Sequence, residues 1–314
     1  MTTEPEEGPP PPPTWAAPAP SGEEGPPPPP TWAAPAPSGE TQSPEDLAPS
    51  PRKGFEGKIA LITGASRGIG RALALRLAAR GATPVINYRR NEDAARDTVA
   101  EIESLGATGL AIRADLESVE QIEEMFDQVS ERFGRLDFFV SNASASNFRP
   151  LMELKPHHLE RTFNANVRAF VVGTQRAAQL MDRGGRIVVL SSYGSLRVFP
   201  TYANLGSTKA ALEMWARYMA VELAPRGINV NAVNPGIIKS DSSSYFYDTG
   251  LVAPLDTVVP KIPKQRLGSV QEAADCVLFL LSPASEYVTG TTLVVDGGLT
   301  AVAPPFESDL SGGH

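Results

Sequence analysis

Tyr202 and Lys209 stand seven residues apart in a segment whose apolar spacing predicts a helix. At about 100° per residue, seven steps return to within about 20° of the same helix face, so both side chains project in one direction. A nearby ammonium group favours the phenolate form of a tyrosine and makes the phenol a better proton donor. The pair therefore predicts a site at which a proton is delivered to a reacting oxygen.

A glycine-rich turn predicts where the phosphates of a cofactor would bind. Residues 58–63 form an apolar run typical of a buried strand, and a helix is expected directly after the turn. Glycines permit a tight turn and a close backbone approach, while a helix N-terminus presents free N–H groups to a pyrophosphate. The strand–turn–helix context therefore predicts a dinucleotide site. The residues expected to form it are Gly64, Ser66, Arg67, Gly68, Ile69 and Gly70.

The end of the second predicted strand, residues 84–87, indicates which dinucleotide is preferred. An acidic residue there would bind the ribose hydroxyls of NAD and repel a 2′-phosphate. The chain instead continues through Arg89 and Arg90 without an acid until Glu92, and Arg67 adds a further cation on that side. Because guanidinium groups pair bidentately with phosphate, we predict NADPH as the cofactor.

Strands and helices alternate along the chain that positions these residues. Such alternation implies right-handed crossovers and a mostly parallel sheet covered on both faces. We therefore predict one α/β domain over residues 52–314, a Rossmann-type doubly wound parallel sheet. A stretch at residues 239–264 lacks the pattern, and it is either an irregular substrate lid or a surface excursion. The predicted strands are 58–63, 84–87, 110–113, 136–140, 186–190, 229–233 and 291–295, and the predicted helices are 68–80, 93–105, 118–133, 156–181, 202–223 and 271–281.

Several motifs resemble those of the short-chain dehydrogenase/reductase family. Beside the glycine turn they are Asp115-Leu116, Asn142-Ala143, Asn234-Pro235-Gly236-Ile237-Ile238 and Val295-Asp296-Gly297-Gly298, so the resemblance covers about residues 57–299. It implies that Asp115, with Leu116 beside it, lies near the adenine ring of the cofactor. It also implies that Asn142 and Ala143 line the cofactor pocket. The cofactor-binding residues implied beside the nicotinamide are Pro235, Gly236 and Ile238.

The spacing of Tyr202 and Lys209 is a departure from the common pattern of the family. The usual tyrosine stands four residues before the lysine, and that position is Leu205 here. The longer spacing resembles the NADPH-dependent, FabL-type enoyl-acyl-carrier-protein reductases, in which a hydride goes to the β-carbon of a conjugated thioester. The resemblance implies that Tyr202 stabilises and protonates the resulting enolate. It implies that Lys209 binds the cofactor ribose and lowers the pKa of Tyr202.

Ser192 and Asn166 keep a second activity open. Ser192 lies thirteen residues before Leu205, where the common ketoreductase arrangement has its substrate-orienting serine. Asn166 matches the helix asparagine that holds a proton-relay water behind the lysine in that family. We predict an enoyl-thioester reductase of fatty-acid biosynthesis. The alternatives are a ketoreductase acting on a 3-oxoacyl or polyketide-like substrate, and a non-catalytic NADP-binding scaffold.

The formal net charge of −8 belongs to the first 51 residues. The chain has 28 basic and 36 acidic residues, and residues 1–51 hold eight acids and no base, which leaves 28 of each in the remainder. A neutral body gives no net attraction to phosphate backbones, so no nucleic acid is expected as a partner. Residues 7–23 recur as residues 24–40, each copy with five successive prolines. This composition predicts a disordered arm, which is either a ligand for a Pro-motif-binding partner or a solvated tail.

Other partners follow from composition and from the family resemblance. No apolar run approaches the roughly 20 residues that span a bilayer, and the chain begins with neither a basic nor an apolar segment, so we expect no membrane partner and a cytoplasmic protein. One cysteine fits a reducing compartment, and no residue cluster has metal-ligand spacing. The resemblance implies a homotetramer and a thioester carried by acyl carrier protein or CoA.

Overall fold

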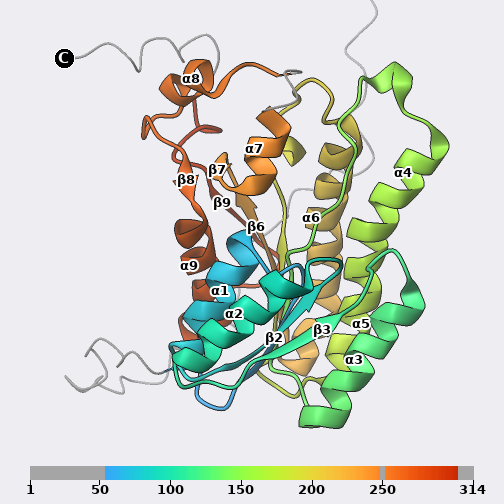
Figure 1. The fold of residues 1–314 in the computed structure, drawn as a ribbon, viewed down its shortest axis with the longest axis vertical. Coiled ribbons are helices and arrows are strands. Elements are labelled where there is room, and N and C mark those ends of the chain that lie inside the picture. The colour runs from blue at the N-terminus through green and yellow to red at the C-terminus, as the bar shows by residue number, and fades with distance from the viewer. Residues whose placement is uncertain (1–53, 248–251, 303–314) are drawn as a thin grey trace, which may run out of the picture. The chain divides into compact units, whose positions relative to one another are not determined.

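The computed structural model describes residues 54–247 and 252–302 of the chain (Figure 1). The chain divides into two units, Met1–Pro49 and Ser50–His314, and every described residue belongs to the second. The predicted acidic arm, residues 1–51, lies outside the described residues. Among the described helices, none is long and apolar enough to cross a membrane.

A seven-stranded parallel sheet forms the centre of the described unit. Its strand order is β3-β2-β1-β4-β5-β6-β9, so the chain builds outward from β1 in one direction and then crosses to β4. The carboxyl ends of β1 and β4 therefore flank the point where the strand order reverses, which is the usual ligand position in such sheets. The strands are β1 (Ile59–Ile62), β2 (Thr83–Tyr88), β3 (Leu110–Arg113), β4 (Phe138–Ser141), β5 (Arg186–Leu190), β6 (Asn229–Pro235) and β9 (Thr292–Val295).

Helices cover both faces of the sheet, as Figure 1 shows. One apolar cluster joins strand residues to α3, α5 and α6, with Phe126 and Phe170 fully buried in it. The other joins them to α1, α2 and α9 and includes Leu77 and Val277. The prediction of a doubly wound Rossmann-type sheet is therefore confirmed. The helices are α1 (Gly68–Ala78), α2 (Glu92–Ser104), α3 (Val119–Phe133), α4 (Pro156–Phe163), α5 (Ala169–Leu180), α6 (Ala203–Leu223), α7 (Asp241–Tyr247), α8 (Leu255–Val258) and α9 (Val270–Leu281).

Two predicted segments differ from the structure. The helix predicted over residues 156–181 is interrupted by a π-helical turn, Asn164–Arg168, between α4 and α5. The stretch expected to be irregular, residues 239–264, instead contains α7 and α8, and a short strand β7 (Ile238–Lys239) pairs with β8 (Gly268–Ser269). Hydrogen bonds from the Ser243 hydroxyl to the carbonyls of Ile238 and Ser240 start this local order, because short polar side chains readily satisfy nearby backbone groups.

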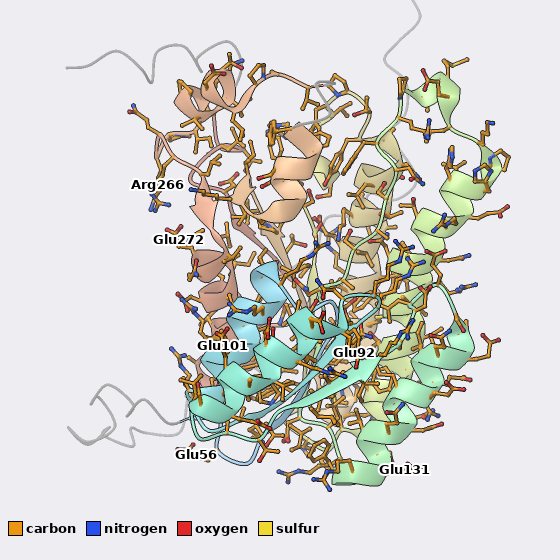
Figure 2. The ribbon with its side chains drawn as sticks, in the orientation of Figure 1. Glu56, Glu92, Glu101, Glu131, Arg266 and Glu272 are labelled. Atoms are coloured by element: carbon orange, nitrogen blue, oxygen red, sulfur yellow. The ribbon has the colours of Figure 1, made fainter. Side chains whose placement is uncertain are left out.

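The entry to α9 is held by a capping box and an ion pair. Ser269 Oγ accepts from the Glu272 N–H at 3.1 Å, and the Glu272 carboxylate accepts in return from the Ser269 N–H at 2.9 Å. Arg266 donates to both oxygens of the same carboxylate, and Figure 2 shows the two side chains together at this end of α9. These hydrogen bonds, those of Arg266 first, lower the pKa of Glu272 to about 2. The cap fixes the point where β8 passes into the helix that covers α1.

Leu77 tests the packing of α1 in its apolar cluster. Leu77 is fully buried, whereas Leu105 at the end of α2 is 49% exposed. We expect Leu77→Ala to lower the free energy of unfolding by about 2–5 kcal/mol, because it removes apolar burial and leaves a cavity. The matched substitution Leu105→Ala should cost less than about 1 kcal/mol. Urea unfolding followed by circular dichroism measures both, and equal losses would contradict the assigned packing.

Candidate active site

A cavity of about 910 Å³ opens at the carboxyl ends of the central strands. It brings together residues that lie far apart in the sequence, from the glycine turn after β1 to the segment after β6. Of the predicted site residues, only Gly70 and Asn166 do not line it. The predicted residues that line it are Gly64, Ser66, Arg67, Gly68, Ile69, Arg89, Arg90, Asp115, Leu116, Asn142, Ala143, Ser192, Tyr202, Lys209, Pro235, Gly236 and Ile238.

The glycine turn approaches the end of β4 so closely that side chains would not fit. A Cβ added to Gly70 would lie 2.6 Å from Asn142 Nδ2, and one added to Gly64 would lie 2.9 Å from Ala143 Cα. Asn142 Nδ2 donates to the carbonyls of Thr63 and Gly64 at 2.9 and 3.1 Å, which locks the turn against β4. Gly70 thus acts by close packing behind the cavity wall, although it does not line the cavity.

The N-terminus of α1 fits the pyrophosphate of a dinucleotide. Arg67 stands at the N-cap position and provides no side-chain hydrogen bond to the helix, and the first turn has no acidic residue. The backbone N–H groups of this turn are therefore free of a side-chain cap, and the helix dipole favours an anion in front of them. Both properties suit the NADP cofactor that the sequence predicts.

The arginines near the end of β2 differ in their surroundings. Arg89 forms ion pairs with Asp115 at 2.9 Å and with Glu117 at 3.0 Å. Arg161 of α4 binds Glu117 as well, and its hydrogen bond is the largest cause of the lowered pKa of the Glu117 carboxyl. Within residues 54–247 and 252–302, no ion pair involves Arg67 or Arg90. These two exposed guanidinium groups are therefore the uncompensated positive charges on this side of the cavity.

Tyr202 and Ser192 meet at the other end of the cavity. Tyr202 is the N-cap residue of α6, and its phenol oxygen lies 2.8 Å from Ser192 Oγ. The chain enters the helix through Thr201, whose φ of 64° is strained for a β-branched residue. Leu205 is buried in the cavity wall. The position four residues before the lysine therefore contributes an apolar surface, and Tyr202 contributes the hydroxyl.

Three aromatic side chains enclose Tyr202. Its ring stacks on Phe148 with centroids 5.6 Å apart, and it contacts Phe199 at 4.2 Å and Phe246 at 5.4 Å. A Cβ at Gly194 would lie 2.3 Å from Tyr202 Cε1, so only glycine fits beneath the ring. These residues come from three separate segments, namely the chain after β4, the chain between β5 and α6, and α7, so the sequence gives little sign that they meet.

The pKa of Tyr202 is raised, whereas the sequence analysis expected Lys209 to lower it. Burial is the larger cause, and the hydrogen bond with Ser192 opposes it. The ammonium of Lys209 instead donates to the carbonyl oxygen of Leu190 at 2.7 Å. Tyr202 is therefore protonated at neutral pH and can donate a hydrogen bond, while the raised pKa makes transfer of the proton itself less favourable than for a tyrosine in water.

Lys209 is buried, with 4% of its surface exposed. Burial lowers its pKa to about 8, and the negative charge of Glu213 partly opposes this shift. Its bond to Leu190 uses one of the three donors of the ammonium group. The remaining donors are available to a ligand in the cavity that Lys209 lines.

Asn166 lies in the π-helical turn, behind the cavity wall. Its Nδ2 donates to the carbonyls of Ala145 and Thr162, and its Oδ1 accepts from Ser144 Oγ. The side chain therefore braces the segment between β4 and α4. Its proposed water-holding role behind Lys209 stays a prediction.

A cavity that joins a pyrophosphate-type helix terminus to a phenol and an ammonium group defines a dinucleotide-dependent oxidoreductase. Residues 64–300 match the family model described as enoyl-(acyl carrier protein) reductase. The chain belongs to this family of short-chain dehydrogenases/reductases, and it is an NADP-dependent reductase. The family, enzyme class and cofactor predicted from the sequence are therefore confirmed.

Three relatives illustrate the range of the family. The 1-cyclohexenylcarbonyl-CoA reductase of Streptomyces collinus is 58% identical over 252 residues, which are 80% of this chain and 90% of that protein. A short-chain dehydrogenase of Burkholderia cenocepacia, solved with NADP, is 37% identical with a TM-score of 0.73, covering 78% of this chain and 99% of that one. The promiscuous reductase LugOII, which catalyses keto-reduction at C1 during lugdunomycin biosynthesis, is 35% identical with a TM-score of 0.72, covering 78% and 98%.

Arg90 and Arg89 should differ in their effect on cofactor choice. We expect Arg90→Ala to raise the KM for NADPH about tenfold or more and to leave the KM for NADH nearly unchanged, because a charge-assisted bond to the 2′-phosphate is lost. Arg89→Ala should raise both constants, since it leaves Asp115 beside the cofactor without its partner, whereas Glu117 keeps Arg161. Steady-state kinetics with both cofactors measure this. Equal effects of Arg90→Ala on NADPH and NADH would contradict the assignment.

Proposed function

We propose that this protein reduces the carbon–carbon double bond of α,β-unsaturated acyl thioesters with NADPH. The observation that carries the proposal is the phenol of Tyr202, which stands seven residues before Lys209 and bonds to Ser192 inside an aromatic enclosure. Leu205 occupies the usual tyrosine position with an apolar side chain. The proton donor is thereby set back along the helix, which suits a reacting oxygen that is three bonds from the carbon that receives the hydride.

Each residue of the site has its own role in the proposed reaction. NADPH, when bound, supplies the hydride to the β-carbon of the substrate. Tyr202 donates a hydrogen bond to the thioester carbonyl oxygen, where negative charge develops, and then delivers its proton to the enolate. Ser192 holds the phenol oxygen in place, and Lys209 binds the ribose of the cofactor. Arg67 and Arg90 bind the 2′-phosphate.

The cavity favours a compact, flat acyl group. Phe148, Phe199 and Phe246 surround Tyr202, and Phe246 comes from α7, which lies beyond the strand ends (Figure 1). Aromatic faces provide large apolar area at low conformational entropy cost. This agrees with the name of the Streptomyces collinus relative, whose substrate carries a cyclohexenyl ring on CoA. We propose a CoA thioester of a cyclic or short unsaturated acid as the substrate.

Several finer predictions stand beside this proposal without further support. An acyl carrier protein as the carrier and a place in fatty-acid biosynthesis remain predictions, as do the homotetramer and the cytoplasmic location. The arm at residues 1–51 as a separate segment, with its Pro-motif-binding partner, also remains a prediction.

Ketone reduction is the second candidate function. The distance of 2.8 Å between the Ser192 and Tyr202 hydroxyl oxygens favours it, because a carbonyl oxygen that enters between them can accept a hydrogen bond from each hydroxyl once the bond between the two is given up. The keto-reducing relative LugOII has a similar fold. The aromatic enclosure admits a ring bearing a ketone as well as one bearing a conjugated thioester.

A direct comparison of substrates tests the proposal. We expect purified full-length protein to oxidise NADPH with 1-cyclohexenylcarbonyl-CoA or crotonyl-CoA, with kcat/KM at least about tenfold above that for acetoacetyl-CoA, because the donor position suits the enolate oxygen. Absorbance at the NADPH band follows the reaction, and mass spectrometry identifies the saturated thioester. Turnover of acetoacetyl-CoA alone would replace the proposal with ketone reduction.

Tyr202→Phe tests the proton donor. The substitution keeps the ring that packs against Phe148 and Phe199 and removes only the hydroxyl group, so kcat should fall by about 100-fold or more while NADPH binding persists. The exposed Tyr287 provides the matched control, and Tyr287→Phe should retain wild-type kcat. Stopped-flow turnover and NADPH fluorescence titration give the two readouts. Near-normal turnover by Tyr202→Phe would remove this residue from the mechanism.

A further inference from the structure

Glu213 is a buried carboxylate beside the active site that the proposed reaction does not use. It lies on α6, one helical turn after Lys209, and 6% of its surface is exposed. A buried carboxylate is unfavourable unless it is hydrogen-bonded, so an apolar residue would stabilise this position more simply. Its presence therefore indicates a task other than packing.

Three side chains donate hydrogen bonds to the same oxygen of Glu213. They are the hydroxyl groups of Ser191 and Ser195, the latter at 2.6 Å, and the amide of Asn234 at 2.8 Å. Asn234 also donates to Ser195 Oγ at 2.8 Å. The three donors are neutral, so the carboxylate is held without being neutralised.

These donors come from three different elements that meet at the cavity. Ser191 follows β5, Ser195 ends a 3₁₀ turn (Tyr193–Ser195), and Asn234 belongs to β6. Glu213 thereby ties both strand ends and the turn to α6. Ser192, which holds the phenol of Tyr202, lies inside the segment that two of these bonds clamp.

Two cations lie four residues from Glu213 along α6, the buried Lys209 and the exposed Arg217. The ammonium of Lys209 bonds to the carbonyl of Leu190, the residue directly before Ser191. The other titratable groups lining this part of the cavity are the phenols of Tyr202 at the start of α6, Tyr193 of the 3₁₀ turn and Tyr247 of α7. The ends of β5 and β6 contribute the neutral side chains of Ser191 and Asn234. Glu213 is thus the negative charge that opposes the burial-induced lowering of the Lys209 pKa.

We propose that Glu213 is a positioning residue that keeps Lys209 charged for the cofactor ribose and holds Ser192 beside Tyr202. The inference rests on the proposed function, because it requires Lys209 and Ser192 to act in the reductase site. The Glu213 carboxylate itself touches neither substrate nor cofactor. Its two effects are separable, since one depends on its charge and the other on its length.

Glu213→Gln removes the charge and preserves the length. The pKa of Lys209 should then fall further below about 8. As the pH is raised, the neutral amine therefore forms earlier than in the wild-type protein, and the loss of NADPH affinity begins at a lower pH. We expect the pH at which NADPH affinity declines to move down by about one unit. Fluorescence titration across pH 6–10 measures it without turnover. Glu222→Gln, on the exposed face of the same helix, is the matched control and should follow the wild-type protein.

Glu213→Asp keeps the charge and shortens the reach. NADPH affinity should then decline at the wild-type pH, while kcat falls about tenfold because the carboxylate no longer clamps the segment that carries Ser192. An unchanged pH dependence of NADPH binding in Glu213→Gln would overturn the proposal, as would an equal shift in Glu213→Asp. If Glu213→Gln does not fold, wild-type kcat in Glu213→Asp overturns it. Failure of wild-type protein to reduce enoyl thioesters would refute the proposed function, while the binding titration would still test the effect on Lys209.

Discussion

A phenol and an ammonium group on one helix are both removed from water, and each must find a polar partner at the ends of the sheet. Tyr202 finds Ser192, and Lys209 finds the carbonyl of Leu190. Both partners belong to the chain that leaves β5, so the position of α6 relative to this strand decides the active-site geometry. An unpaired polar group here would cost a large part of the stability of a typical domain.

The two ends of the cavity differ in their electrostatics: one carries exposed positive charge, and the other favours uncharged groups. At the cofactor end, Arg89 is compensated by carboxylates, whereas Arg67 and Arg90 remain positive and exposed. At the catalytic end, aromatic rings and burial favour the neutral phenol and lower the pKa of the lysine. The proposed phosphate site is solvated and the proposed proton donor is buried, and both are possible because the parallel sheet places separate strand ends under each.

The aromatic rings around Tyr202 also line the space in which a substrate would bind. Phe246 contacts both Phe148 and Tyr202, so the helix that covers the cavity also contributes to the environment of the proton donor. A substrate that fills this space replaces ring-to-ring contacts with contacts to itself. In the proposed reaction, the selection of substrate shape and the delivery of the proton would therefore depend on the same side chains.

Much of the fold and the cofactor end of the site was predictable from the sequence, because their signals are local. Apolar periodicity predicted β3 and β5 with their observed bounds, and the predicted residues of the glycine turn, except Gly70, line the cavity. The spacing of Tyr202 and Lys209 predicted a shared helix face, and both line the cavity. The predicted direction of the Tyr202 pKa shift was wrong, since it depends on burial, and rings from distant segments, Phe148 and Phe246, pack against this side chain only in the folded chain. Glu213 and Gly194 gained their roles only when packing brought β5, β6 and α6 together, because burial and hydrogen bonding between distant segments exist only in the folded chain.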